Sequence, residues 1–146
     1  METKKEKDID YFSSDFANNF LADYNIDITN INQESEKFDT IICYHILEHI
    51  IDDQKAIAEL YRVLKPDGKL LFAEHGISHE SNVAKWQNRI TPGWKKISGD
   101  CHLNRPIDKI IVEAKFEIVS IKRFYQENIP KIAGYIYLGE AKKLNL

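Results

Sequence analysis

Residues 38–75 read FDTIICYHILEHIIDDQKAIAELYRVLKPDGKLLFAEH, and the succession of patterns in this stretch decides the fold. Its first part, 38–45, is β-branched and apolar on both faces, which is typical of a strand covered on both sides in a parallel sheet. A helical pattern follows, and after the Lys-Pro-Asp-Gly turn at 65–68 a second strand is expected over 69–75. The stretch therefore predicts a strand–helix–strand unit with parallel strands.

The helix between these two strands has a marked beginning and one apolar face. Asp52 and Asp53 supply an N-cap and negative charge in the first turn. The apolar residues that follow recur at helical spacing and form a single stripe made by Ala56, Ile57, Leu60, Val63 and Leu64. This stripe is expected to pack the helix on the sheet.

Two more helices are expected downstream. One covers 81–90 and ends before Pro92, and its apolar residues at helical spacing are Val83, Trp86 and Ile90. The other begins at Pro106, a residue that suits the first position of a helix. Its apolar face is made by Ile107, Ile110, Ile111 and Ala114.

The chain ends in two strand patterns, 117–124 and 135–141. The connection between them is too short for a crossover helix, so the pair predicts an antiparallel hairpin. At the other end of the chain, 11–24 is expected to form a helix and 24–28 a short strand.

The composition bounds the class of protein. The 146 residues are 43% hydrophobic, and 20 basic against 23 acidic residues give a net charge of −3. This profile predicts one globular domain over 1–146 with a frayed segment at 1–8, and it offers no basic surface for nucleic acid or an anionic membrane. No apolar stretch is long enough for a bilayer, and the charged N-terminal residues show no secretory signal. Two cysteines without CxxC spacing are typical of reduced thiols, so a cytoplasmic location is expected.

His45-Ile46-Leu47-Glu48-His49 fits H-x-x-E-H, a signature of zinc peptidases in which two imidazoles bind zinc from one helical face. That use requires all five residues to be helical, whereas His45 ends a predicted strand and the next helix begins at Asp52 or Asp53. A strand followed by a loop is expected to spread the two rings apart, and the sequence marks no third ligand. We therefore expect no metal here, and a zinc peptidase remains an alternative function.

The same segment resembles the class I S-adenosylmethionine-dependent methyltransferases. Phe38-Asp39, His45–His49 and Tyr61–Gly68 match, in one register, that family's fourth strand, the loop after it and the turn before the fifth strand. Farther on, the stretch Cys101-His102-Leu103-Asn104-Arg105 is similar to the branch related to thiol methylators. The resemblance implies an α/β fold with a Rossmann-like methyltransferase sheet, helices on both faces and a C-terminal antiparallel hairpin. It also implies a domain truncated at its N-terminal side, because the first two strands are not found.

The resemblance implies S-adenosylmethionine as the cofactor and a small-molecule methyl acceptor. Asp27 and Ile28 correspond to the pair that contacts the adenine. Three residues correspond to the methionine side of the pocket: His45, Leu47 and Glu48. Asp27 suits a turn equally well, since Asp-x-Thr before Asn30 is turn chemistry. The family's glycine-rich turn is absent, because no glycine precedes Gly68.

Methyl transfer from S-adenosylmethionine to a small molecule is thus the implied function, and the missing glycine turn leaves open a non-catalytic module or a partner subunit. No catalytic base is assigned, although histidines titrate near neutrality and three are candidates: His75, His79 and His102. An apolar strand at 38–45 without its neighbour exposes an edge that recruits another strand. We expect 22–28 to pair beside it, with self-association through the 38–45 edge as the alternative.

Overall fold

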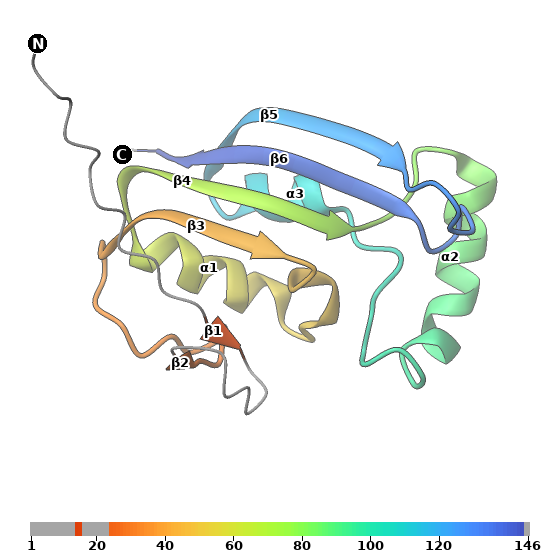
Figure 1. Ribbon diagram of the computed structural model, residues 1–146, viewed down its shortest axis with the longest axis horizontal. Coiled ribbons are helices and arrows are strands. Elements are labelled where there is room, and N and C mark those ends of the chain that lie inside the picture. The colour runs from red at the N-terminus through yellow and green to blue at the C-terminus, as the bar shows by residue number, and fades with distance from the viewer. Residues whose placement is uncertain (1–13, 16–23, 145–146) are drawn as a thin grey trace, which may run out of the picture.

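The computed structural model describes residues 14–15 and 24–144, and its centre is a four-stranded sheet in the order β3-β4-β6-β5 (Figure 1). β3 (Phe38–Tyr44) and β4 (Leu64–His75) run parallel. β6 (Tyr135–Lys143) runs antiparallel to β4 on one side and to β5 (Phe116–Tyr125) on the other. The α/β sheet, its parallel pair and its C-terminal hairpin are confirmed.

The crossover between the parallel strands is α1 (Asp53–Val63). The side chain of Asp52 caps this helix by accepting a 2.9 Å hydrogen bond from the Lys55 backbone N–H. The expected apolar stripe is buried against the sheet at Ala56, Ile57, Leu60 and Val63. The strand–helix–strand unit predicted from 38–75 is therefore present with its cap and its buried face.

β4 begins earlier than expected, because the Lys-Pro-Asp-Gly segment is an irregularity inside the strand. Phe38 pairs with Leu64 and Thr40 pairs with Lys69, so the residues between Leu64 and Lys69 bulge out of the ladder. Asp67 lies in the left-handed region with a φ of 60°, a conformation that Asp tolerates.

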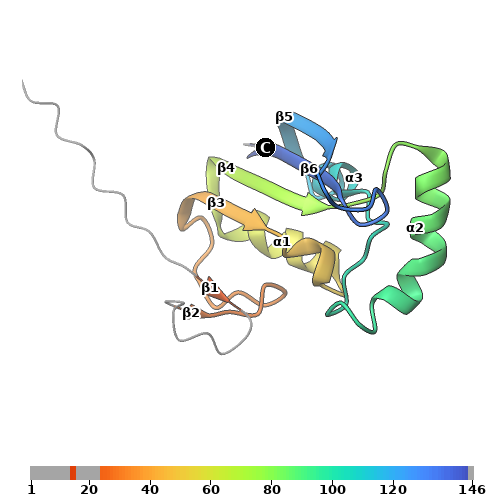
Figure 2. The ribbon, with the colours of Figure 1, turned by 45° about the vertical axis from the view of Figure 1, so that its right-hand side comes forward.

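Two of the described helices cover one face of the sheet. α1 and α3 (Ile107–Glu113) lie on the same side (Figure 2), and α3 buries its apolar residues at Ile107, Ile110 and Ile111 as expected. On the opposite face, Ile42 is 63% exposed and Tyr44 is 66% exposed. The expectation of helices on both faces, and of a strand covered on both sides, is therefore wrong for the described part of the chain.

α2 (Ser81–Trp94) lies at the end of the sheet and differs from its prediction in length and orientation. Pro92 lies inside the helix, which continues to Trp94 and does not end before Pro92 as expected. The buried residues are Gln87 and Thr91, whereas Trp86 is 53% exposed. Gln87 binds the Ser78 backbone N–H at 2.8 Å and the Gly76 carbonyl at 3.1 Å. The hydrogen bonds of the buried Gln87 side chain therefore orient this helix.

The N-terminal segment does not repair the edge of β3. β1 (Ser14–Asp15) and β2 (Tyr24–Asn25) pair with each other in parallel, so the helix expected over 11–24 is wrong at these residues. The short strand expected over 24–28 is present only at its first two residues. Between 14 and 15 and from 24 to 144, no strand pairs with the free edge of β3. The frayed segment predicted at 1–8 lies outside the described residues.

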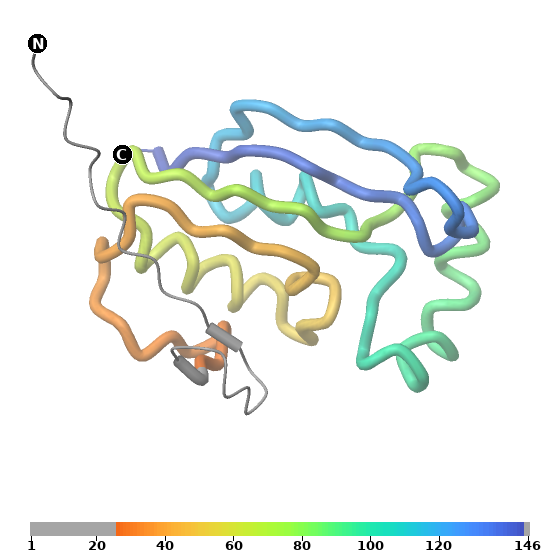
Figure 3. Tube along the Cα trace, viewed as in Figure 1, coloured from red at the N-terminus to blue at the C-terminus, as the bar shows by residue number. Residues whose placement is uncertain are grey.

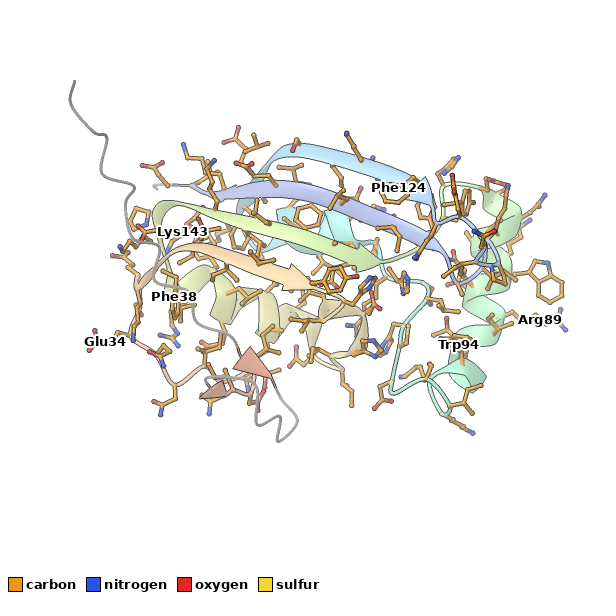
Figure 4. The ribbon with its side chains drawn as sticks, in the orientation of Figure 1. Glu34, Phe38, Arg89, Trp94, Phe124 and Lys143 are labelled. Atoms are coloured by element: carbon orange, nitrogen blue, oxygen red, sulfur yellow. The ribbon has the colours of Figure 1, made fainter. Side chains whose placement is uncertain are left out.

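The physical reason lies in the segment that leads into β3. Glu59 of α1 accepts a 2.8 Å hydrogen bond from the Ile31 N–H, and Arg62 donates to the carbonyls of Ile31 at 2.8 Å and Gln33 at 2.9 Å. These bonds hold the segment on α1 and away from the edge of the sheet. Figure 4 shows the two ends of the sheet, with Phe38 and Lys143 where β3 begins and Phe124 where β4 ends.

Candidate functional site

A loop that carries His45, Glu48 and His49 follows β3 at the carboxyl end of the parallel pair. His45 takes a left-handed φ of 50° and donates its backbone N–H to the Ala73 carbonyl at 2.9 Å, which turns the chain out of the sheet. A short 3-10 helix, η1 (Leu47–His49), completes the loop. Ligands of open α/β sheets bind at this end of the strands.

Three histidines surround the carboxylate of Glu48, which is 2% exposed. Its Oε1 lies 3.3 Å from His45 Nδ1, 3.4 Å from His49 Nε2 and 3.0 Å from His75 Nδ1. Its Oε2 accepts the backbone N–H of His75. The expectation that His45 and His49 are spread apart is wrong, because both rings contact the same oxygen. One of the two grounds for expecting no metal here, the separation of the rings, is thereby removed.

The peptidase arrangement is nevertheless not formed. The H-x-x-E-H pattern needs five consecutive helical residues, whereas His45 lies at positive φ and the helical turn begins only at Leu47. Glu48 is enclosed by imidazoles and is not held over an open helical face.

The electrostatics of the cluster favour a proton on His75. The Cys101 thiol and then Glu48 raise the pKa of His75 to about 9. Burial would raise the pKa of Glu48, but the hydrogen bond and charge of His75 lower it below its ordinary value. The pair is therefore an imidazolium and a carboxylate at neutral pH, so His75 is poorly suited to be a general base.

A second buried carboxylate holds the site loop through hydrogen bonds to its backbone. Glu74 of β4 accepts the backbone N–H of Ile46 at 3.1 and 3.0 Å and that of Glu48 at 3.4 Å. Burial raises the pKa of Glu74 to about 7. These bonds fix the loop on the end of the neighbouring strand.

The segment after α2 closes the loop from the other side, as the trace in Figure 3 shows. His102 donates its backbone N–H to the Glu48 carbonyl at 2.7 Å, and burial lowers the pKa of its ring. The His49 ring binds the Gly99 carbonyl at 2.6 Å through Nδ1. The buried Arg105 donates to the carbonyls of Leu47 and Ile51.

The five residues assigned to the cofactor from the resemblance fall into three places. His45 and Glu48 lie together in the cluster, whereas the side chain of Leu47 lies in the core. Asp27 and Ile28 lie on a separate loop. There the Asp27 carboxylate accepts 2.8 Å bonds from the Thr29 N–H and hydroxyl, which lower its pKa. Asp27 therefore acts as a turn residue, which is one of the two roles that the sequence predicts for it.

Asp27 also lines a pocket of about 310 Å³. The pocket is also lined by Thr29 and by three residues at the end of the site loop, Ile50, Ile51 and Asp52. The pocket joins the Asp27 turn to the loop after β3, which are separate in the sequence.

Sequence reasoning missed Cys101 and Arg105 as neighbours of this loop. His75 had a usable signal, because the carboxyl ends of parallel strands meet and both His45 and His75 end such strands. The segment that contains Cys101 has no helix or strand periodicity, so nothing local places it beside Glu48.

Aromatic side chains form a second group at the same end of the sheet. His79 Nδ1 lies 2.8 Å from the Tyr135 hydroxyl, and the Tyr125 hydroxyl lies 2.5 Å from Ser78 Oγ. The rings of Tyr125 and Tyr135 are 5.0 Å apart. Tyr125 ends β5, Tyr135 begins β6, and Ser78 and His79 lie just before α2 in the chain.

The family described as a methyltransferase domain matches residues 5–72. The thiol S-methyltransferase TMT1B of Rattus norvegicus is 33% identical over 104 residues, which are 70% of this chain and 42% of that protein. The chain belongs to the class I S-adenosylmethionine-dependent methyltransferase family. Within it, the chain is related to the thiol S-methyltransferases, as the 101–105 stretch indicated. The chain spans less than half the length of these curated relatives.

Solved structures agree with this methyltransferase fold. A SAM-dependent methyltransferase from Methanosarcina mazei superposes with a TM-score of 0.61 at 17% identity, covering 81% of this chain and 65% of that one. The [4+2]-cyclase SpnF superposes with a TM-score of 0.62 at 15% identity, covering 82% of this chain and 54% of that one. These likenesses show the fold alone, and a cyclase among them illustrates that this fold does not set the reaction.

The residues present fit part of the methyltransferase cofactor. An exposed carboxylate at Asp27 beside the apolar Ile50 and Ile51 suits the amino group and ring of an adenine. Residues 1–67 contain no glycine, so these residues offer no glycine-rich turn for a close backbone approach to the methionine part of the cofactor. Among the described helices, none combines the length and apolar character needed to cross a membrane.

Proposed function

We propose that the protein transfers a methyl group from S-adenosylmethionine to a small-molecule thiol. The observation that carries this proposal is the loop after β3, where residues that match the family's motif converge at the carboxyl end of a parallel strand pair. The relationship to thiol S-methyltransferases supports the acceptor class. When bound, the cofactor supplies an electrophilic methyl group on a sulfonium.

Two groups of residues hold the cofactor in this proposal. Asp27 and the Ile50–Asp52 end of the site loop line the pocket proposed for the adenine. Ile28, which packs against the core, is the second residue that the family resemblance assigns to the adenine. His45 and Glu48 lie on the methionine side, and Leu47 contributes through its backbone because its side chain is buried.

The aromatic group made by His79, Tyr125 and Tyr135 borders the place of the acceptor. Aromatic rings make favourable contacts with sulfur, which suits a thiol. A thiolate is a strong nucleophile, so transfer depends chiefly on holding its sulfur in line with the methyl group.

The free edge of β3 limits what one chain does alone. In the methyltransferase family another strand lies beside this one, and here the edge is unpaired among the described strands. A second copy of the chain pairing along 38–45 completes the sheet. The isolated monomer therefore binds cofactor weakly and does not turn over. A non-catalytic, cofactor-binding module is the second candidate, favoured by the absence of glycine before Gly68.

Calorimetric titration with S-adenosylhomocysteine tests the cofactor residues. Asp27→Ala is expected to weaken binding by about 1–3 kcal/mol, the range for loss of a polar partner. His45→Ala and Glu48→Ala weaken it as well. His79→Ala serves as the control and leaves affinity unchanged. Equal affinity of Asp27→Ala and the wild type would remove the adenine assignment.

A methyl-transfer assay tests the reaction. Formation of S-adenosylhomocysteine is measured with dithiothreitol as the thiol and catechol as the hydroxyl acceptor, over a range of protein concentrations. We expect turnover with the thiol and none with catechol. Turnover per chain is expected to rise with the protein concentration, because pairing of two chains completes the site. Cofactor binding without transfer at any concentration would favour the non-catalytic module.

A further inference from the structure

His49 is held in one tautomer by the segment that follows α2. Its Nδ1 lies 2.6 Å from the Gly99 carbonyl oxygen, which can only accept a hydrogen bond, so Nδ1 carries the hydrogen. In the neutral ring, Nε2 then carries a lone pair. That atom lies 3.4 Å from Glu48 Oε1, which is also an acceptor. Either a proton on Nε2 or a metal ion between the two atoms satisfies both acceptors.

The Cys101 thiol lies at the same place. Its sulfur, a carboxylate oxygen of Glu48 and a ring nitrogen of His49 all lie within 4.8 Å of one another. In a tetrahedral zinc site, bonds of about 2.0–2.3 Å separate neighbouring ligand atoms by about 3.3–3.7 Å. The 3.4 Å between nitrogen and oxygen already has that value. The sulfur adds a soft ligand, which favours zinc over magnesium or calcium.

We propose that Glu48, His49 and Cys101 bind a zinc ion. Glu48 and Cys101 are buried, whereas the His49 side chain is 38% exposed, which leaves a fourth position towards solvent. The Gly99 carbonyl on the far nitrogen of His49 is the kind of outer contact that orients histidine ligands. Methyl transfer to a thiol does not require this ion, so the site goes beyond the proposed function.

The other side of the carboxylate is a weaker metal site. His75 Nδ1 lies 3.0 Å from Glu48 Oε1, the length of an ordinary hydrogen bond. A hydrogen on that nitrogen satisfies both groups without a metal. His45 and His75, although close to Glu48, are therefore hydrogen-bonded neighbours of the zinc site.

The zinc ligands are held in place before the ion binds. Glu74 and Arg105 fix the backbone of the loop that carries Glu48 and His49. The bond from the His102 N–H to the Glu48 carbonyl, 2.7 Å long, ties the Cys101 segment to the same loop. A preformed set of ligands lowers the cost of ordering them on binding.

Cobalt substitution tests the sulfur ligand. The full chain is titrated with Co²⁺, and we expect a sulfur-to-cobalt charge-transfer band in the near ultraviolet together with the intense visible bands of a tetrahedral site. Cys101→Ser is expected to lose the near-ultraviolet band. Cys43→Ser, which alters the other buried cysteine, is the matched control and retains it. Loss of the band in Cys43→Ser alone, or its absence from the wild type, would overturn the proposal.

Zinc calorimetry tests the histidine. One ion per chain is expected, and His49→Ala weakens binding by more than the roughly 10- to 100-fold that loss of an outer contact costs. His79→Ala is the control and binds zinc as the wild type does. If His45→Ala abolishes binding and His49→Ala does not, the ion belongs on the other side of Glu48 and the proposal is wrong. S-adenosylhomocysteine affinity measured with a chelator present tests the cofactor site separately.

Discussion

Arg105 and Asp53 form an ion pair behind the site loop, with 3.2 Å between Nε and Oδ2. The Arg105 guanidinium also donates to the carbonyls of Leu47 and Ile51. Arg105→Met leaves these groups without their donor, and we expect the free energy of unfolding to fall by about 3 kcal/mol, the low end of the range for breaking a buried pair. Urea denaturation followed by circular dichroism measures it.

Arg123 supplies the matched control for this prediction. It pairs with Asp108 at 2.6 Å near the surface, where both side chains are partly exposed. Arg123→Met is expected to cost less than about 1 kcal/mol, as exposed pairs usually do. Equal losses in the two variants would contradict a special role of Arg105 in holding the loop.

Glu59 makes stability depend on pH at the acid end. The hydrogen bond from Arg62 lowers its pKa, against the effect of burial and together with the Ile31 N–H. A lowered folded pKa means that the stabilisation is present above the ordinary value of 4.5 and is lost as the pH falls through the folded value. Glu59→Gln is expected to lose less unfolding free energy between about pH 5 and pH 3 than the wild type. Identical pH profiles from urea titrations would refute this.

Gly139 lies in β6 where no side chain fits. A Cβ there would lie 2.6 Å from Phe72 Cζ and would also meet the Ser120 carbonyl. Gly139→Ala is expected to cost about 1–3 kcal/mol, as overpacking does. Gly93 in α2 has open space around its Cβ position, so Gly93→Ala should stabilise by about 0.5–1 kcal/mol. Thermal and urea unfolding measure the stability of both variants, which is expected to fall in Gly139→Ala and to rise in Gly93→Ala.

The free edge of β3 predicts self-association. Two copies that pair through β3 form one continuous sheet about a two-fold axis. Ile42→Lys places like charges close together in that pairing and is expected to yield a monomer in sedimentation velocity. Val119→Lys, on the exposed face of the opposite edge strand β5, leaves the oligomeric state unchanged. A wild type that stays monomeric at all concentrations would exclude this interface.

The elements that the sequence predicts correctly are those whose signal is local. The α1 stripe and its Asp52 cap need only neighbouring residues, and both are present. α2 differs from its expected orientation because that orientation depends on Gln87, which binds groups at Gly76 and Ile132. A polar residue that is buried by distant partners leaves no apolar periodicity to read.

The candidate site was predictable only in part for the same reason. His45 and Glu48 lie close in sequence and were found as a pair. Their contact with Cys101 depends on a segment without regular structure, which reaches the loop only after α2 has been placed. The exposed Ile42 and Tyr44 show the converse, because a strand pattern cannot tell whether a covering layer is present.

The antiparallel pairing of β4 with β6 also shapes how the chain folds. Residues 38–75 and 116–143 each pair within themselves, through a crossover and a hairpin that need only local contacts. Leu70 meets Ala141 only when these two halves come together. Closing so long a loop costs entropy before any contact offsets it, so we expect the meeting of the halves to be the slow step of folding. We therefore expect the two halves to form before β4 pairs with β6.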